Sequence, residues 1–177
     1  MNYYAVLMAV GEDKPGLVDT ISKFILDCGG NIEDSRMAIL GGEFAMLILV
    51  TGQQQVIDRV IKGAPEAGER SGLAIQAKLT RAPSDAVKRG TIPYSIEAFS
   101  MDHPGIVQRV ASYLAERKIN IRALDTRLAN APITGLPLFS LHAIVDIPAT
   151  QNLVEIRRGL ENIAVQHNID IEMKPAK

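Results

Sequence analysis

Hydrophobic and polar positions in the first half of the chain follow two periods, one typical of strands and one typical of helices. Four short apolar runs have the length and composition of strands: 3–10, 32–40, 44–51 and 73–79. Two further segments, 17–28 and 53–65, carry apolar residues at the spacing of one helical face. The order is βαββαβ, which predicts an α+β, ferredoxin-like unit with an antiparallel four-stranded sheet and both helices on one face.

Glycine pairs mark two of the predicted boundaries. Gly29-Gly30 follows the first helical stripe, where glycine accepts the left-handed conformation that ends helices. Gly41-Gly42 lies between two strand-like runs and has the chemistry of a two-residue hairpin turn.

The second half repeats this plan. Strand-like runs cover 94–100, 121–128, 139–147 and 169–173, and apolar stripes at helical spacing cover 106–114 and 153–164. The predicted hairpin at 129–136 is longer than its counterpart and contains Pro132 and Gly135. The chain therefore carries the βαββαβ pattern twice.

A repeated phrase confirms that the halves are copies. Gly11–Val18 recurs as Ser100–Val107, with Pro15 matching Pro104 at an offset of 89 residues (104 − 15). Asn31-Ile32 falls on Asn120-Ile121 at the same offset (120 − 31 = 89). A period this long indicates two copies of one small domain rather than a solenoid.

The repeat predicts a first domain at 1–80, a linker at 81–91 and a second domain at 92–177. Segment 80–92 is rich in turn-forming and polar residues. Its cations, Arg81, Lys88 and Arg89, stand against Asp85, so the segment is either a solvated linker or a basic patch.

Composition and charge exclude several classes of protein. The chain has 177 residues, of which 47% are apolar and 22% charged, as in ordinary globular proteins. Its net charge of −1 creates no field that recruits nucleic acid or an anionic membrane. The sequence shows no secretory leader and no apolar run of about 20 residues. Its single cysteine, Cys28, fits a reducing cytosol, so we expect a cytoplasmic protein that does not bind membranes.

The Asp-x-Pro-Gly turns are the first candidate site, and they allow two interpretations. Proline suits a first helical turn, and Asp13 or Asp102 could cap the helix by accepting bonds from backbone amides. Alternatively, the amides hold the carboxylate of a ligand and the aspartate receives its ammonium group. The two uses compete, because a carboxylate engaged as a cap has less capacity for a ligand.

Other polar positions also have two interpretations. Asn31 and Asn120 suit turn chemistry after a helix, or a binding role. His103 replaces Lys14 in the second turn, and exposure competes there with contact to an anionic ligand. Asp34-Ser35-Arg36 and Asp125-Thr126-Arg127 match as acid–hydroxyl–Arg triplets whose charged members share one strand face. These triplets predict either a cross-strand ion pair on the solvent side or an interface.

The sequence offers no catalytic set. Cys28 lies on an apolar helical stripe and is expected to pack as a small hydrophobe. The histidines lack metal-ligand spacing, and no phosphate loop or nucleophile motif stands out. We therefore expect a protein that is not an enzyme, with no metal site and no cofactor.

A strand ending in Asp-x-Pro-Gly, followed by an apolar helix, Asn-Ile and a βαβ completion, resembles the ACT domain over both halves. In the first half, Cys28–Arg36, Ala38, Leu40-Gly41 and Glu43-Phe44 also resemble the glycine cleavage system transcriptional repressor family, whose members are two ACT domains. The second half matches more loosely, through Asn120-Ile121, 125–127 and Phe139.

The resemblance implies a regulatory protein that senses a small amino acid such as glycine or serine. It implies control of transcription in glycine or amino-acid metabolism through a partner, such as a transcriptional activator, without direct contact to nucleic acid. Ligands of this family lie at the surface between domains. The candidate ligand-binding residues are Asp13, Pro15, Gly16, Leu17, Val18, Asn31, Asp102, His103, Gly105, Ile106, Val107 and Asn120.

Two alternatives to a sensor stay open. One is a ligand-free module for protein–protein contacts, including a homodimer. The other is an accessory domain protein of a one-carbon or amino-acid enzyme, because the family also resembles the ACT portion of formyltetrahydrofolate deformylase.

Overall fold

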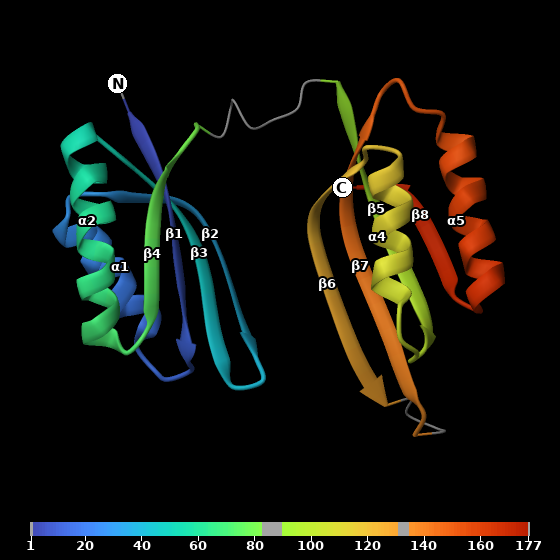
Figure 1. Ribbon diagram of the computed structural model, residues 1–177, viewed down its shortest axis with the longest axis horizontal. Helices are drawn as coiled ribbons and strands as arrows, with labels where there is room; N and C mark the ends of the chain where they lie inside the picture. The colour runs from blue at the N-terminus through green and yellow to red at the C-terminus, as the bar shows by residue number, and fades with distance from the viewer. Residues whose placement is uncertain (1, 83–89, 131–134, 177) are drawn as a thin grey trace. The chain divides into compact units, whose positions relative to one another are not determined.

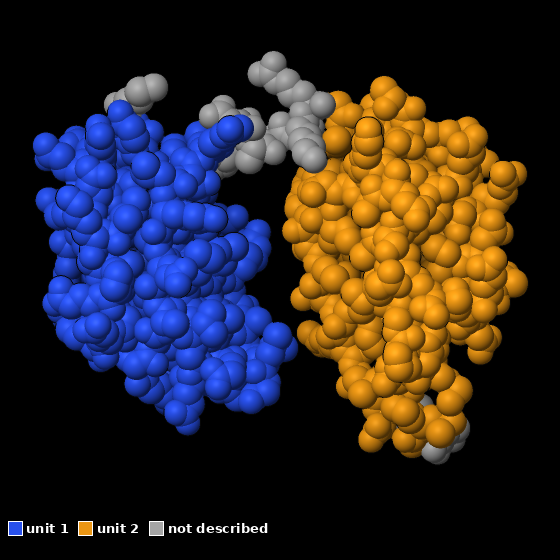
Figure 2. All heavy atoms as spheres, in the orientation of Figure 1, with its two compact units in different colours: residues 1–87 blue, residues 88–177 orange. Residues whose placement is uncertain are grey.

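The computed structural model describes residues 2–82, 90–130 and 135–176. The chain divides into two compact units, 1–87 and 88–177, which Figure 2 colours separately. Most of the predicted linker (83–89) and the middle of the predicted second hairpin (131–134) lie outside the described residues.

The first unit is an antiparallel four-stranded sheet with two helices on one face (Figure 1). Its sheet order is β2-β3-β1-β4, which confirms the ferredoxin-like arrangement. Gly41 and Gly42 join β2 to β3 with φ of 61° and 86°, the left-handed values that a tight hairpin turn requires. The elements are β1 (Tyr3–Glu12), α1 (Leu17–Asp27), β2 (Asn31–Leu40), β3 (Glu43–Gly52), α2 (Gln54–Ser71) and β4 (Ala74–Thr80).

The second unit repeats this topology, with the sheet order β6-β7-β5-β8. Its two helices also lie on one face of the sheet (Figure 1). The elements are β5 (Thr91–Met101), α4 (Ile106–Glu116), β6 (Asn120–Asn130), β7 (Pro137–Pro148), α5 (Leu153–His167) and β8 (Asp170–Pro175).

Helix α2 runs six residues beyond the predicted end at 65, straight past Pro65. Proline removes one helical hydrogen bond, but burial of the following turn outweighs that loss. Ala64 and Ala67 are buried, and a Cβ on Gly68 would lie 2.5 Å from the carbonyl oxygen of Leu73. Only glycine permits this approach to the start of β4, and the helix ends at Gly72 with φ 74°.

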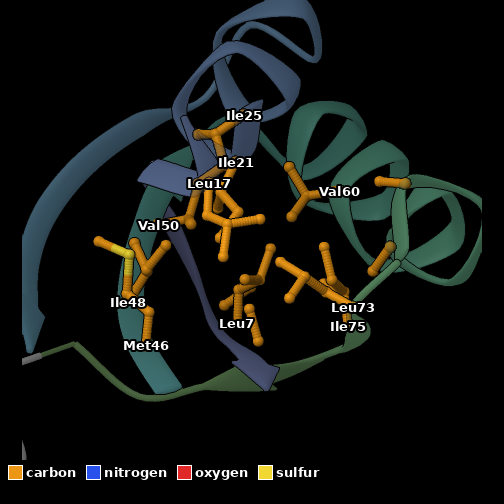
Figure 3. Close-up of a cluster of buried hydrophobic side chains, with 14 of the residues drawn as sticks. Leu7, Leu17, Ile21, Ile25, Met46, Ile48, Val50, Val60, Leu73 and Ile75 are labelled. Atoms are coloured by element: carbon orange, nitrogen blue, oxygen red, sulfur yellow. The ribbon is translucent and has the colours of Figure 1, made fainter. Parts of the chain in front are cut away.

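Each core lies between one sheet face and the two helices. In β1, Ala5, Leu7 and Ala9 alternate inward and are fully buried. Figure 3 shows Leu7 among side chains from β3, α1, α2 and β4. The buried core of the second unit is built in the same way from Tyr94, Ile96, Ala98, Ile106, Val110, Leu114, Leu141, Ala143, Val145, Ile147, Ile156, Leu160 and Met173, among others.

Both helix pairs pack an aromatic ring of the first helix onto a glycine of the second. Phe24 and Tyr113 occupy equivalent positions (113 − 24 = 89). A Cβ on Gly63 would lie 3.1 Å from the Phe24 ring, whereas one on Gly159 would overlap the Tyr113 hydroxyl. That hydroxyl donates a hydrogen bond to the Ile156 carbonyl oxygen at 3.0 Å. Burial raises the pKa of Tyr113.

A β-bulge interrupts the outer strands β2 and β6 at the same place. The register shifts between Ile32 and Asp34 in β2, and between Ile121 and Ala123 in β6. The extra residues are Glu33 and Arg122, again 89 apart (122 − 33). Arg122 forms an ion pair with Asp146, whose side chain is only 11% exposed.

We expect Gly159→Ala to destabilise the second unit by about 1–3 kcal/mol, because Tyr113 must move away from Ile156. This loss exceeds the gain of about 1 kcal/mol from the better helix propensity of alanine. Denaturant unfolding measures the change. Gly63→Ala is the matched control, and we expect it to be near neutral because the Phe24 ring can shift by a few tenths of an ångström. Equal costs in the two variants would contradict this account of the packing.

We expect Arg122→Ala to cost about 1–3 kcal/mol of unfolding free energy, because Asp146 keeps a nearly buried carboxylate without its partner. Arg36→Ala serves as the control, since the Arg36–Asp34 pair is exposed and should contribute less than about 1 kcal/mol. Denaturant titrations compare the variants. A smaller loss for Arg122→Ala than for Arg36→Ala would show that burial does not set the strength of these pairs.

Candidate ligand-binding turns

The turn after β1 is fixed by backbone bonds and one left-handed glycine. The Asp13 amide donates to the Gly42 carbonyl oxygen at 2.9 Å, which attaches the turn to the β2–β3 hairpin. Gly16 then adopts φ 93° and ψ 0° directly before α1. The Thr20 amide and hydroxyl both donate to the Gly16 carbonyl oxygen, at 2.9 and 3.0 Å. The chain therefore enters the helix at a defined angle.

The turn after β5 has the same construction. The Asp102 amide donates to the Pro137 carbonyl oxygen at 3.1 Å, and Gly105 adopts φ 97° and ψ 0° before α4. The Arg109 amide donates to the Gly105 carbonyl oxygen at 3.0 Å. The two copies have thus kept one backbone conformation despite their different side chains.

The N-cap residues of α1 and α4 are glycines, and in the described part of the chain neither helix start has a side-chain cap bond. Asp13 and Asp102 are both exposed and contribute no capping bond, so the capping interpretation of these aspartates is wrong. An uncapped helix start presents backbone N–H groups and the positive end of the helix dipole. A carboxylate can bind such groups, and an aspartate beside them can receive an ammonium group.

The second turn brings together His103, Arg109 and His167, whereas the first turn carries Lys14. Arg109 Nε donates to the ring of His167, at the end of α5, with a distance of 3.0 Å to Nε2. His103 Nε2 donates to the His167 carbonyl oxygen at 3.2 Å. His103 is therefore half-buried and held in place, and the expectation that it is exposed is wrong. The counterpart of Arg109 in the first copy is Thr20 (109 − 89).

The charge of this cluster depends on His167. Partial burial lowers the pKa of His167, and the charges of Arg109 and His103 lower it further. A ring nitrogen accepts a bond from Arg109 only while it carries no proton. The neutral ring therefore supports the contact between α4 and α5, and a protonated ring opposes it.

The remaining candidate residues divide between core and surface. Leu17 and Ile106 bury their side chains in the cores, so only their backbone faces the turn. Val18 is exposed and Val107 half-buried. Pro15 is exposed.

Asn31 and Asn120 do not join the turns of their own units. Asn31 begins β2 and pairs with Thr51, which pairs with Tyr4 near the start of β1. Asp13 follows the other end of β1. A strand of this length separates them by roughly 30 Å, so one small ligand cannot contact Asn31 and Asp13 of the same unit. Asn120 pairs with Asp146 and is separated from Asp102 by the length of a strand in the same way.

The acid–hydroxyl–Arg triplets lie on the sheet faces that the helices leave open. Arg36 binds Asp34 along one strand at 2.5 Å, so the two share a face as predicted, but the pair is not cross-strand. The bulges align the copies at an offset of 89 residues, whereas the triplets are 91 apart (125 − 34). The second triplet is therefore two residues further along its strand and has different neighbours: His142 opposite Asp125, and Ser140 opposite Arg127.

Other chemistry is sparse within the described residues. Cys28 is half-buried against the first core, as expected, and burial raises the pKa of its thiol. Among residues 2–82, 90–130 and 135–176, no three His, Cys, Asp or Glu side chains gather as a metal site. None of the helices in this part of the chain is long and apolar enough to cross a membrane.

Sequence reasoning missed the contact between Arg109 and His167. Arg109 lies one helical turn after Gly105, so its closeness to the turn could have been read from the helix period. His167 is 58 residues further on, and no local pattern marks it as a neighbour.

The lowered pKa of His167 predicts a loss of stability on acidification. An unfolded histidine titrates near pH 6.5. Below that value the unfolded chain takes up a proton more readily than the folded one, so the free energy of unfolding falls as the pH drops from about 7 toward the folded pKa. Melting temperatures between pH 7.5 and 5.5 measure this slope. His167→Gln should flatten it, and an unchanged slope in that variant would refute the assignment.

Comparison with known proteins supports the fold and its duplication. A family model for the ACT domain matches residues 3–78. The glycine cleavage system transcriptional repressor of Escherichia coli K12 is 29% identical over 168 residues, which cover 94% of this chain and 86% of the repressor. A UPF0237 protein of Methanopyrus kandleri is 32% identical over 73 residues, which cover 40% of this chain and 81% of that protein.

Two solved structures match the whole chain. One is a protein of unknown function from Galdieria sulphuraria, with 26% identity, a TM-score of 0.82 and full coverage of both chains. The other is provisionally named a glycine cleavage system transcriptional repressor, with 22% identity, a TM-score of 0.73 and coverage of 100% of this chain and 99% of that one. The first unit matches the ACT domain model and the second repeats its topology, so the chain carries two ferredoxin-like ACT domains in tandem and resembles the glycine cleavage system transcriptional repressors along nearly its whole length.

Proposed function

We propose that this protein is a regulator without catalytic activity that senses a small amino acid of the glycine or serine class. It modulates transcription of glycine or amino-acid metabolism through a partner protein in the cytoplasm. The ligand's carboxylate binds backbone amides at the start of α1 or α4, and its ammonium group binds Asp13 or Asp102. The observation that carries the proposal is the pair of uncapped helix starts, each beside an aspartate that makes no capping bond.

The backbone conformation supports a binding role for these turns. Gly16 and Gly105 share φ and ψ within a few degrees, although the residues around them differ. Both turns are attached to a neighbouring hairpin through an aspartate amide, so the amides of the first helical turn are oriented before a ligand arrives. Such preorganisation lowers the entropic cost of binding.

The second turn is the better carboxylate site. Arg109 lies against Gly105, with a distance of 3.4 Å from Nη1 to its carbonyl oxygen, and adds a full positive charge next to the helix start. In the first copy, Thr20 stands in place of Arg109, and exposed Lys14 stands in place of His103. We therefore assign the tighter site to Asp102–Val107 and a weaker site to Asp13–Val18.

Regulation through a partner is supported by the folds and by charge. In both units each described helix packs on its own sheet, and the net charge of the chain is −1 (Figure 1). Binding to DNA draws most of its affinity from clustered cations, which this composition does not favour. The E. coli relative is named a transcriptional repressor, and a protein of this fold could serve as one by holding a DNA-binding activator.

Thermal unfolding against each of the twenty amino acids tests the sensor. A ligand at 100 times its dissociation constant stabilises the folded state by about 2.7 kcal/mol, which raises the melting temperature by about 5–10 °C. Among amino acids with small side chains, we expect glycine or serine to produce a selective shift. Asp102→Asn should abolish most of this shift while leaving the unliganded melting temperature nearly unchanged, because Asp102 makes no capping bond.

Asp13→Asn is the matched control in the first copy, and we expect it to remove only the weaker part of the response. A selective shift that survives in Asp102→Asn would move the site away from this turn. The absence of a shift with any amino acid would refute the sensor and favour a ligand-free module for protein–protein contacts.

A further inference from the structure

The open face of the second sheet contains a hollow of about 160 Å³. Its walls come from three neighbouring strands, β5, β6 and β7, on the side away from the helices. The lining residues include Glu97, Phe99, Asp125, Arg127, Ser140 and His142. The hollow is smaller than the pockets that hold drug-sized ligands, so it suits a small molecule.

The strand register arranges these side chains in two adjacent rows. In one row, His142 lies between Glu97 on β5 and Asp125 on β6. In the next row, Ser140 lies between Phe99 and Arg127. Cross-strand neighbours of this kind have Cβ atoms about 5 Å apart, so the acid, the guanidinium and the aromatic ring all border the same space.

Several of these groups already have partners, and two do not. Glu97 binds Lys174 at 2.8 Å, and this contact lowers the pKa of Glu97. His142 Nε2 shares a hydrogen bond with Ser95 Oγ at 3.1 Å. Among the described residues, neither Asp125 nor Arg127 has an ion-pair partner. One negative and one positive group therefore border the hollow without forming an ion pair with any described residue.

The first unit shows the same residue types in a closed arrangement. Its open face has a hollow of about 100 Å³ lined by Asp34, Arg36 and the apolar Val6, Leu47 and Leu49. There the aspartate and the arginine bind each other at 2.5 Å. Because the second triplet lies two residues further along its strand, Asp125 and Arg127 neighbour the polar His142 and Ser140. There the two charges stay apart and can bind a ligand.

We propose that the hollow formed by Phe99, Asp125 and Arg127 binds a zwitterion with an apolar group, the chemistry of a free amino acid with a large apolar side chain. Arg127 holds the carboxylate through its planar fork of donors, and Asp125 holds the ammonium group. Phe99, a residue that is 53% exposed, contacts the apolar side chain.

This site is separate from the turns assigned above. Its residues lie on strands of the open face, whereas Asp102 leads into α4 on the helix-covered face. It also selects a different ligand, because glycine has no side chain to cover Phe99. The inference does not depend on the proposed sensing of glycine or serine.

Three probes test which charged group of the ligand binds to Arg127 and which binds to Asp125. L-Leucine carries both charges, leucinamide lacks the carboxylate, and 4-methylpentanoate lacks the ammonium group. Amide NMR spectra of the full chain, titrated with each probe, give affinities and locate the site. We expect leucine to shift resonances of 97–99, 125–127 and 140–142 and to bind about tenfold or more tightly than either analogue.

Substitutions at the hollow supply the second half of the test. Arg127→Gln should bind leucine and leucinamide with equal affinity, and Asp125→Asn should bind leucine and 4-methylpentanoate with equal affinity, because each variant loses one charge contact. Arg36→Gln and Asp34→Asn are the matched controls in the first unit. Asp102→Asn tests whether leucine binds at the turn before α4 instead. All three should bind leucine as the unmodified protein does.

Three results would overturn the proposal. The first is the absence of shifts around Phe99 at about 10 mM leucine, a concentration that detects even weak binding. The second is unchanged discrimination between the probes in Arg127→Gln and Asp125→Asn. The third is loss of leucine binding in Asp102→Asn, which would place the ligand at the turn.

Discussion

Each unit of this protein depends on the burial of one sheet face beneath two helices. The central strands can bury alternate residues completely only because the first helix crosses the second at close range, and that approach requires a glycine opposite an aromatic ring. The Phe24–Gly63 and Tyr113–Gly159 contacts set this distance in the two copies. The opposite sheet face takes no part in the core, so its residues are available for binding chemistry.

The sequence predicts most of this architecture, because strands and helices leave strong periodic signals. The order of elements, the hairpin at Gly41-Gly42 and both core stripes follow from local patterns. The end of α2 does not. The helix continues past Pro65, and the packing of Gly68 on Leu73, a tertiary contact, determines where it ends. Local propensity is outweighed wherever such burial is available.

The candidate sites are harder to predict for the same reason. The Asp-x-Pro-Gly phrase locates both turns, but it cannot show that the aspartates make no capping bond. The pairing of Arg109 with His167 joins residues 58 apart, and the charges at the open faces depend on strand register. Similar triplets in the sequence have different neighbours in space, because each strand is aligned by its bulge and not by its motif.

The bulges at Glu33 and Arg122 have a consequence for the history of the duplicated domain. They act as fixed reference points, so the two copies superpose through them while the acid–hydroxyl–Arg triplet has moved along its strand. A shift by an even number of residues keeps side chains on the same face. Duplicated sheets can therefore relocate a charged motif to a new site while the backbone and core are inherited unchanged.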